Sequence, residues 1–116
     1  MKRVAIPVTN GQLSEYFEQC DYYEIFHIGS ENTQIEKMEN PHGGDITKLP
    51  EWVAGIGITD IITYKIDKHI INLFTSYRIN LFVGIPVNSP HNLIKDYMNG
   101  KLISDQKIIN EIISAE

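Results

Sequence analysis

The chain has 116 residues and a formal net charge of −5, with 42% hydrophobic and 22% charged residues. These values are ordinary for a globular protein, so we expect residues 1–116 to form a single domain with its own core. An acidic chain lacks the basic surface that displaces counterions from phosphates, which argues against nucleic-acid binding. No run of residues is long and apolar enough to span a bilayer, so no membrane segment is expected.

The single cysteine, Cys20, excludes a disulfide within the chain and an iron–sulfur or zinc site made only of its own cysteines. A lone thiol suits a reducing compartment, and the N-terminal residues lack the long apolar segment of a signal peptide. We therefore expect a cytoplasmic protein. A free cysteine is more often a small buried hydrophobe than a reactive thiol, and no cationic residue adjoins Cys20.

The first forty residues predict three strands. Residues 3–8, RVAIPV, form a continuous apolar run that is typical of a buried strand. Residues 21–28 are aromatic and β-branched, and after a hairpin connection residues 34–39 alternate weakly. The charges of this last segment favour an edge strand, because they discourage pairing with another chain. Together the three strands predict an antiparallel meander.

Helices and strands alternate in the second half of the chain. Apolar residues at helical spacing and short apolar runs predict, in order, helix 49–56, strand 59–64, helix 67–77 and strand 79–85. Asp67 is the expected cap of the second of these helices. A further helix is predicted within residues 88–100, where Ser89 is the cap, Pro90 occupies the first turn and Gly100 ends the helix.

The tail, residues 103–116, predicts an appended C-terminal helix with an apolar stripe of Ile108, Ile109, Ile112 and Ile113. Strands linked through helices pair in parallel, with right-handed crossovers. The whole order therefore predicts an α/β fold, in which one five-stranded mixed sheet is flanked by helices.

Histidine is the first candidate for chemistry, and the chain has four. His27 lies in a predicted strand and is expected to be structural, whereas His69 and His91 lie in first helical turns and are expected to be exposed. His42 has a different context, the motif ENPHGG at residues 39–44.

In this motif Pro41 stiffens the loop, while Gly43 and Gly44 permit backbone angles closed to other residues. Such a loop leaves space around the imidazole of His42, and neutral imidazole is both a metal ligand and a general base. The alternative is a strand-to-helix connector whose glycines serve only the turn.

Acidic residues form the second candidate set: Asp21, Asp45, Asp60 and Asp67. Two or three of them could converge to bind Mg²⁺, which would favour a metal-dependent hydrolase. Helix caps and turns explain each of them individually, so this hypothesis depends on fold analogy alone. The chain has no G-x-G-x-x-G fingerprint and no P-loop.

The segment RVAIPVTNGQLSEYFEQCDYYEIFHI, the motif ENPHGG and the later segment EWVAGIGITDIIT together resemble the dinitrogenase iron–molybdenum cofactor biosynthesis family, the NifX/NafY-like domains. The resemblance covers residues 2–102. It implies a ribonuclease-H-like α/β fold and a non-enzymatic role in binding or carrying an iron–sulfur or iron–molybdenum cluster. It further implies cluster-assembly proteins as partners.

The resemblance also implies site residues, with His42 as the metal ligand; the cofactor-binding positions are Ser14, Phe17, Asn40, His42, Gly43 and Gly44. Three places depart from the family pattern. Tyr16 stands where histidine is usual, Glu18 stands where glycine is usual, and residues 63–68, TYKIDK, contain no glycine. Clusters take thiolate or imidazole ligands, and anionic clusters favour glycine-rich loops, so the site in this chain could have degenerated.

A different class of function is an interaction module. If the isoleucine stripe of residues 104–116 were exposed, it would need a partner, for example a second copy of the chain in a homodimer. The alternative is that the stripe docks onto the sheet of its own chain.

Overall fold

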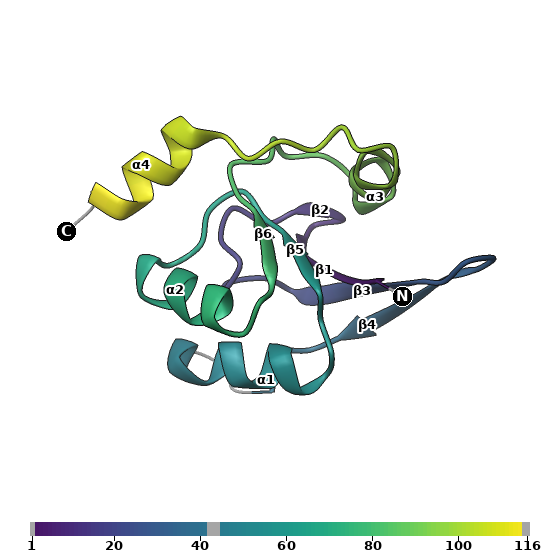
Figure 1. The fold of residues 1–116 in the computed structure, drawn as a ribbon, viewed down its shortest axis with the longest axis horizontal. Helices are drawn as coiled ribbons and strands as arrows, with labels where there is room; N and C mark the ends of the chain where they lie inside the picture. The colour runs from purple at the N-terminus through teal and green to yellow at the C-terminus, as the bar shows by residue number, and fades with distance from the viewer. Residues whose placement is uncertain (1, 42–44, 115–116) are drawn as a thin grey trace.

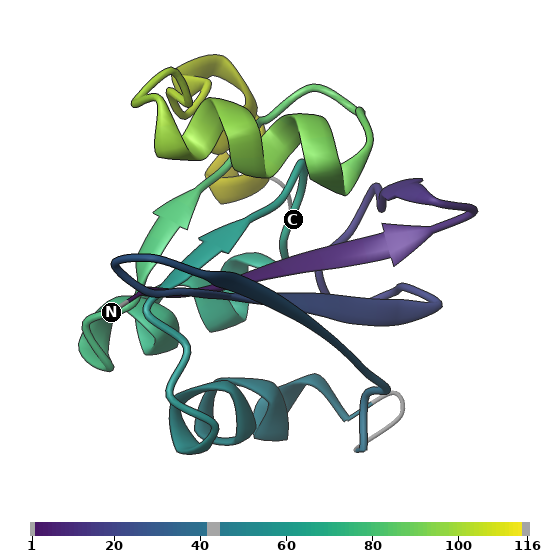
Figure 2. The same ribbon diagram turned by 90° about the vertical axis from the view of Figure 1, so that its right-hand side faces the viewer.

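The computed structural model describes residues 2–41 and 45–114. One mixed sheet lies between helices on its two faces (Figures 1 and 2). The strands are β1 (Lys2–Thr9), β2 (Gln12–Leu13), β3 (Tyr22–Ile28), β4 (Thr33–Met38), β5 (Asp60–Ile62) and β6 (Asn80–Phe82). A 3₁₀ turn (Ile46–Lys48) precedes the helices α1 (Leu49–Gly55), α2 (Lys68–Ser76), α3 (Pro90–Met98) and α4 (Gln106–Ser114).

The strand order is β4-β3-β1-β5-β6, with β2 paired to β1 off this path. β1, β3 and β4 pair antiparallel, and β5 pairs in parallel with both β1 and β6. The predicted meander, parallel pairs and edge strand are therefore confirmed. The predicted number of strands was wrong, because the sheet formed by the described residues has six. The sixth, β2, has only two residues, too few to produce a periodic pattern.

The sheet is buried on both faces because its central strand alternates between two cores. In β1, Ala5 contributes to the core under α1 and α2, whereas Val4 and Ile6 contribute to the core under α3. Side chains of a strand point alternately to opposite faces, so a continuous apolar run such as RVAIPV supplies both cores at once.

The predicted helix caps are present. The carboxylate of Asp67 accepts a hydrogen bond from the His69 backbone amide at 2.8 Å, and Ser89 accepts one from the Asn92 amide at 3.2 Å. Gly100 follows α3 with a φ of +69°, a left-handed conformation that favours glycine. These caps set where α2 and α3 begin, and α2 begins beside the pocket described below.

The C-terminal helix α4 docks onto its own chain. Three of the four stripe residues, Ile108, Ile109 and Ile112, pack against the core under α1 and α2, while Ile113 is 59% exposed. Of the two possibilities for the stripe, an interface with a partner or docking onto its own chain, the second is therefore correct for these three side chains. None of the helices formed by residues 2–41 and 45–114 is long and apolar enough to cross a membrane.

Candidate functional site

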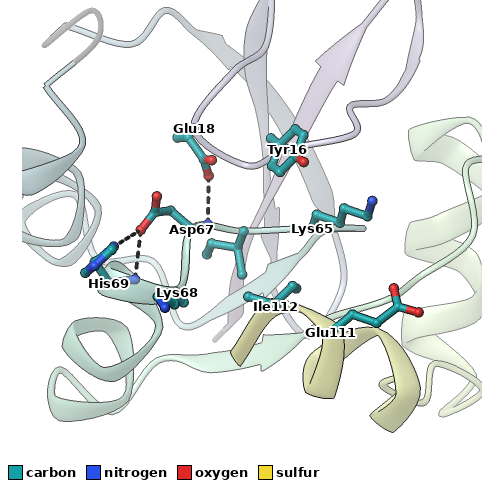
Figure 3. Close-up of a pocket in the computed structure, with 9 residues that line it drawn as sticks. Tyr16, Glu18, Lys65, Asp67, Lys68, His69, Glu111 and Ile112 are labelled. Carbon is teal, nitrogen blue, oxygen red and sulfur yellow. Dashed lines mark hydrogen bonds and ion pairs between the residues drawn. The ribbon is translucent and has the colours of Figure 1, made fainter. Parts of the chain in front are cut away.

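A pocket of about 310 Å³ opens between three segments that are far apart in the sequence (Figure 3). The loop after β2, the segment between β5 and α2, and helix α4 each contribute to it. Its lining residues are Tyr16, Glu18, Lys65, Ile66, Asp67, Lys68, His69, Glu111 and Ile112.

The pocket lies beyond the carboxyl ends of the parallel strands β1 and β5. A β-bridge joins Tyr16 to Lys65, so the two loops are held in register. The Phe17 amide donates to the Lys65 carbonyl, and the Lys65 amide donates to the Glu15 carbonyl, each at 2.9 Å. In open α/β sheets the carboxyl ends of parallel strands are where ligands commonly bind.

One side of the pocket carries two carboxylates and an imidazole. Glu18 Oε1 accepts a hydrogen bond from the Asp67 backbone amide at 3.1 Å, and His69 Nδ1 lies 3.0 Å from Asp67 Oδ1. Burial raises the pKa of the Glu18 carboxyl, and the nearby charge of Asp67 raises it further. The side chain of His69 remains 75% exposed, so its ring can be reached from solvent.

The other side carries an ammonium group framed by aromatic rings. Lys65 Nζ lies 5.9 Å from the ring centroid of Tyr16 and 5.3 Å from that of Tyr64. A cation over such a ring is attracted by the electrons of its face. Lys65 forms no ion pair with the residues that the structure describes. Because the aromatic rings do not neutralise it, the positive charge of Lys65 remains available to an anionic group in the pocket.

The departures from the family pattern meet in this pocket. Tyr16, Glu18 and residues 65–68 of the segment TYKIDK all line it, although they come from two separate loops. Sequence reasoning did not find Glu111 and Ile112 as lining residues. The isoleucine stripe indicated that α4 would bury one face, but no pattern indicated which part of the domain it would cover.

The predicted site residues outside this pocket have other surroundings. Ser14 is 2% exposed and shares a hydrogen bond with the Thr9 hydroxyl. Phe17 is fully buried, and its ring centroid lies 4.9 Å from that of Tyr23. Neither of them is among the lining residues, and Asn40 is half-buried beyond the end of β4. The remaining three, His42, Gly43 and Gly44, lie outside the described residues.

Cys20 is half-buried, and burial raises the pKa of its thiol to about 11. A thiol with so high a pKa is protonated at neutral pH, and it is a poor nucleophile and a poor metal ligand until it loses that proton. The structure thus agrees with the expectation of an unreactive side chain. His27 pairs with Glu36 at 3.1 Å across the β3–β4 ladder, and His91 is exposed on α3.

The four aspartates considered for a metal site serve separate local roles. Asp21 accepts from the Asn10 amide, Asp45 accepts from Thr47 in the 3₁₀ turn, and Asp67 caps α2. Asp60 is 2% exposed and accepts a hydrogen bond from Thr59 at 2.6 Å. Among residues 2–41 and 45–114, no three histidine, cysteine or acidic side chains are grouped so that they could hold a metal ion.

Comparison with known proteins gives a consistent result. The family described as dinitrogenase iron-molybdenum cofactor matches residues 1–100. The uncharacterised protein MJ0580 of Methanocaldococcus jannaschii is 27% identical over 109 residues, which cover 88% of this chain and 90% of that protein. The crystal structure of PH0822 is 27% identical and superposes with a TM-score of 0.79, over 91% of this chain and 96% of the other.

The apo form of the orange protein from Desulfovibrio gigas superposes with a TM-score of 0.77, covering 90% of this chain and 93% of the other. At 10% identity this likeness concerns the fold alone. The family match ends at residue 100, so α4, which lines one wall of the pocket, lies outside it.

Proposed function

Because the chain belongs to the dinitrogenase iron–molybdenum cofactor family, we propose that it is a non-enzymatic domain that binds or carries a metallocluster or a cluster precursor. The observation that carries the proposal is the open pocket of about 310 Å³ beyond the carboxyl ends of β1 and β5. Besides its carboxylates, it presents the ammonium group of Lys65, which attracts an anionic cargo, and the imidazole of His69, a donor to soft metal ions.

His69 is the described pocket residue with the donor that clusters prefer. Its Nδ1 faces Asp67 Oδ1 at 3.0 Å; in the tautomer that carries its proton on Nδ1, this contact is a hydrogen bond and the lone pair of Nε2 is free for a metal. Ligation by few side chains holds a cluster without enclosing it, which suits a carrier that must release its cargo.

The residues implied by the family resemblance remain part of this proposal. His42 is proposed as a second imidazole ligand, with Gly43 and Gly44 permitting close approach and Asn40 preceding the loop. Ser14 and Phe17 would support the loop that carries Tyr16 and Glu18, since both are buried directly beside these two positions. The proposed cargo is delivered to or received from cluster-assembly proteins.

We also infer that the fold is ribonuclease-H-like, as the family resemblance implies. This is supported by the order β4-β3-β1-β5-β6, in which three antiparallel strands precede two strands that pair in parallel through helical crossovers.

The test is anaerobic loading of the purified chain with iron, sulfide and tetrathiomolybdate, followed by desalting and elemental analysis. We expect bound metal with charge-transfer absorption in the visible range, reduced in His69→Ala and in His42→Ala. His91→Ala is the matched control, because this histidine is exposed on α3 and does not line the pocket. A colourless and metal-free wild-type protein after loading would refute the proposed function.

A further inference from the structure

We propose that α4 is the specificity-determining wall of the pocket, where Ile112 restricts entry and Glu111 disfavours strongly anionic ligands. The inference builds on the proposed function, because it takes this pocket to be the ligand site. It concerns residues beyond position 100, where the family match ends. Figure 3 shows Glu111 and Ile112 rising from α4 toward the segment that carries Lys65 and Asp67.

The start of α4 is held tightly against the end of β6. The Val83 amide donates to Ser104 Oγ at 3.1 Å, and the Asp105 amide donates to the Val83 carbonyl at 2.8 Å. Gly84 has a φ of +81°, and a Cβ there would lie 2.5 Å from Asp105 Cβ and 3.1 Å from Ile108 Cβ. Glycine at position 84 therefore allows Asp105 and Ile108 to pack closely against it, and any larger residue would prevent this packing.

Ile112 forms the apolar part of the wall. It is half-buried and packs against the core under α1 and α2, while it also lines the cavity. The wall is thus continuous with the core and is not a loosely attached tail. Its neighbour Ile113 is 59% exposed and does not line this pocket, so one helix provides both a functional position and a control.

Glu111 changes the charge that a ligand meets. The pocket also contains the carboxylates of Glu18 and Asp67, and Lys65 is the cation for which no ion pair is found among the described residues. A further carboxylate on α4 offsets the attraction that Lys65 exerts on an anion. Glu111 is exposed beside this open cavity, and one such charge close to a bound dianion changes the affinity by about three- to tenfold.

The first experiment measures access without any cargo. The full chain is treated with formaldehyde and a reducing agent, and the methylation rates of Lys65 and Lys95 are compared by mass spectrometry. Lys95 lies on α3, away from the pocket, and serves as the internal reference. We expect Ile112→Ala to raise the Lys65 to Lys95 rate ratio at least about twofold and Ile112→Val to raise it less, with no change in Ile113→Ala. An unchanged ratio in folded Ile112→Ala would overturn the restriction of entry.

The second experiment measures charge selection by titration with tetrathiomolybdate, a dianion. We expect Glu111→Gln to bind this probe about three- to tenfold more tightly than wild type. Glu51→Gln, which removes an exposed charge on α1, should bind as wild type does. Equal affinities in the two variants would overturn the role of Glu111. Absence of binding in all three proteins would refute the proposed anionic cargo and the role of Glu111 together, while the methylation ratio would still decide the role of Ile112.

Discussion

Replacing Gly84 with alanine tests how the C-terminal helix is attached to the domain. The φ of +81° at this position is unfavourable for any residue with a Cβ. The added methyl would also lie 2.5 Å from Asp105 Cβ and 3.1 Å from the Asp105 backbone nitrogen. Backbone atoms cannot rotate away as a flexible side chain can, so the segment that leads into α4 must move.

The expected loss in the free energy of unfolding of Gly84→Ala has two parts. A left-handed conformation costs an alanine about 1–2 kcal/mol. Overpacking against a fixed neighbour typically costs a further ~1–3 kcal/mol. Gly100 separates them, because its φ is +69° but a Cβ there would meet nothing within 4 Å. We therefore expect Gly100→Ala to show only the first part, and Gly84→Ala to exceed it by about 1–3 kcal/mol in the free energy of unfolding.

Urea unfolding followed by the fluorescence of Trp52, the only tryptophan, measures both variants. In Gly84→Ala the amides of α4 should in addition exchange with deuterium faster than in wild type, because the helix loses its close attachment. Equal losses of stability in the two variants, with unchanged exchange in α4, would show that the approach of Asp105 to Gly84 is not what holds the helix in place.

Two further predictions follow from the ionisable groups. Burial, together with the Asp67 charge, raises the pKa of Glu18 above its ordinary value of 4.5. The folded state therefore binds the proton more tightly than the unfolded state does. As a result, the free energy of unfolding falls as the pH rises from about 4.5 through the folded-state pKa. Glu18→Gln should therefore have a higher urea midpoint than wild type at pH 7, and the difference should narrow toward pH 4; a difference that widens on acidification would contradict this. Burial raises the pKa of the Cys20 thiol to about 11, so iodoacetamide should alkylate this thiol slowly in the folded protein at pH 8. The alkylation rate should then rise about tenfold per pH unit up to pH 10. A rate that levels off below pH 9 would disprove the raised pKa.

Local signals in the sequence predicted much of the fold. A helix cap such as Asp67 or Ser89 acts within one helical turn, so the neighbouring residues are enough to predict where the helix begins. The apolar run of β1 likewise indicated a strand buried on both faces. The two-residue strand β2 was missed because it is too short to carry a period of its own, although its pairing of Leu13 with Val8 is local.

The pocket was less predictable because its parts come from three distant segments. The hydrogen bond from the Asp67 amide to Glu18 spans 49 positions, and a single sequence contains no signal for such a pair. The stripe on α4 predicted that one helix face would be apolar, which is correct for Ile108, Ile109 and Ile112. The pattern could not indicate that the same face would border a pocket.

The contacts within the pocket join its first two loops to each other. Tyr16 is bridged to Lys65 through the backbone and lies under its ammonium group, and Glu18 accepts a hydrogen bond from the Asp67 amide. Each of these two side chains in the first loop thus contacts a residue of the second loop. The Tyr16 ring and the Glu18 carboxylate are therefore both held against the second loop, at the edge of an open cavity. The backbone bonds between the two loops hold these side chains in place without any bound ligand, so the shape of the pocket is set by the fold itself.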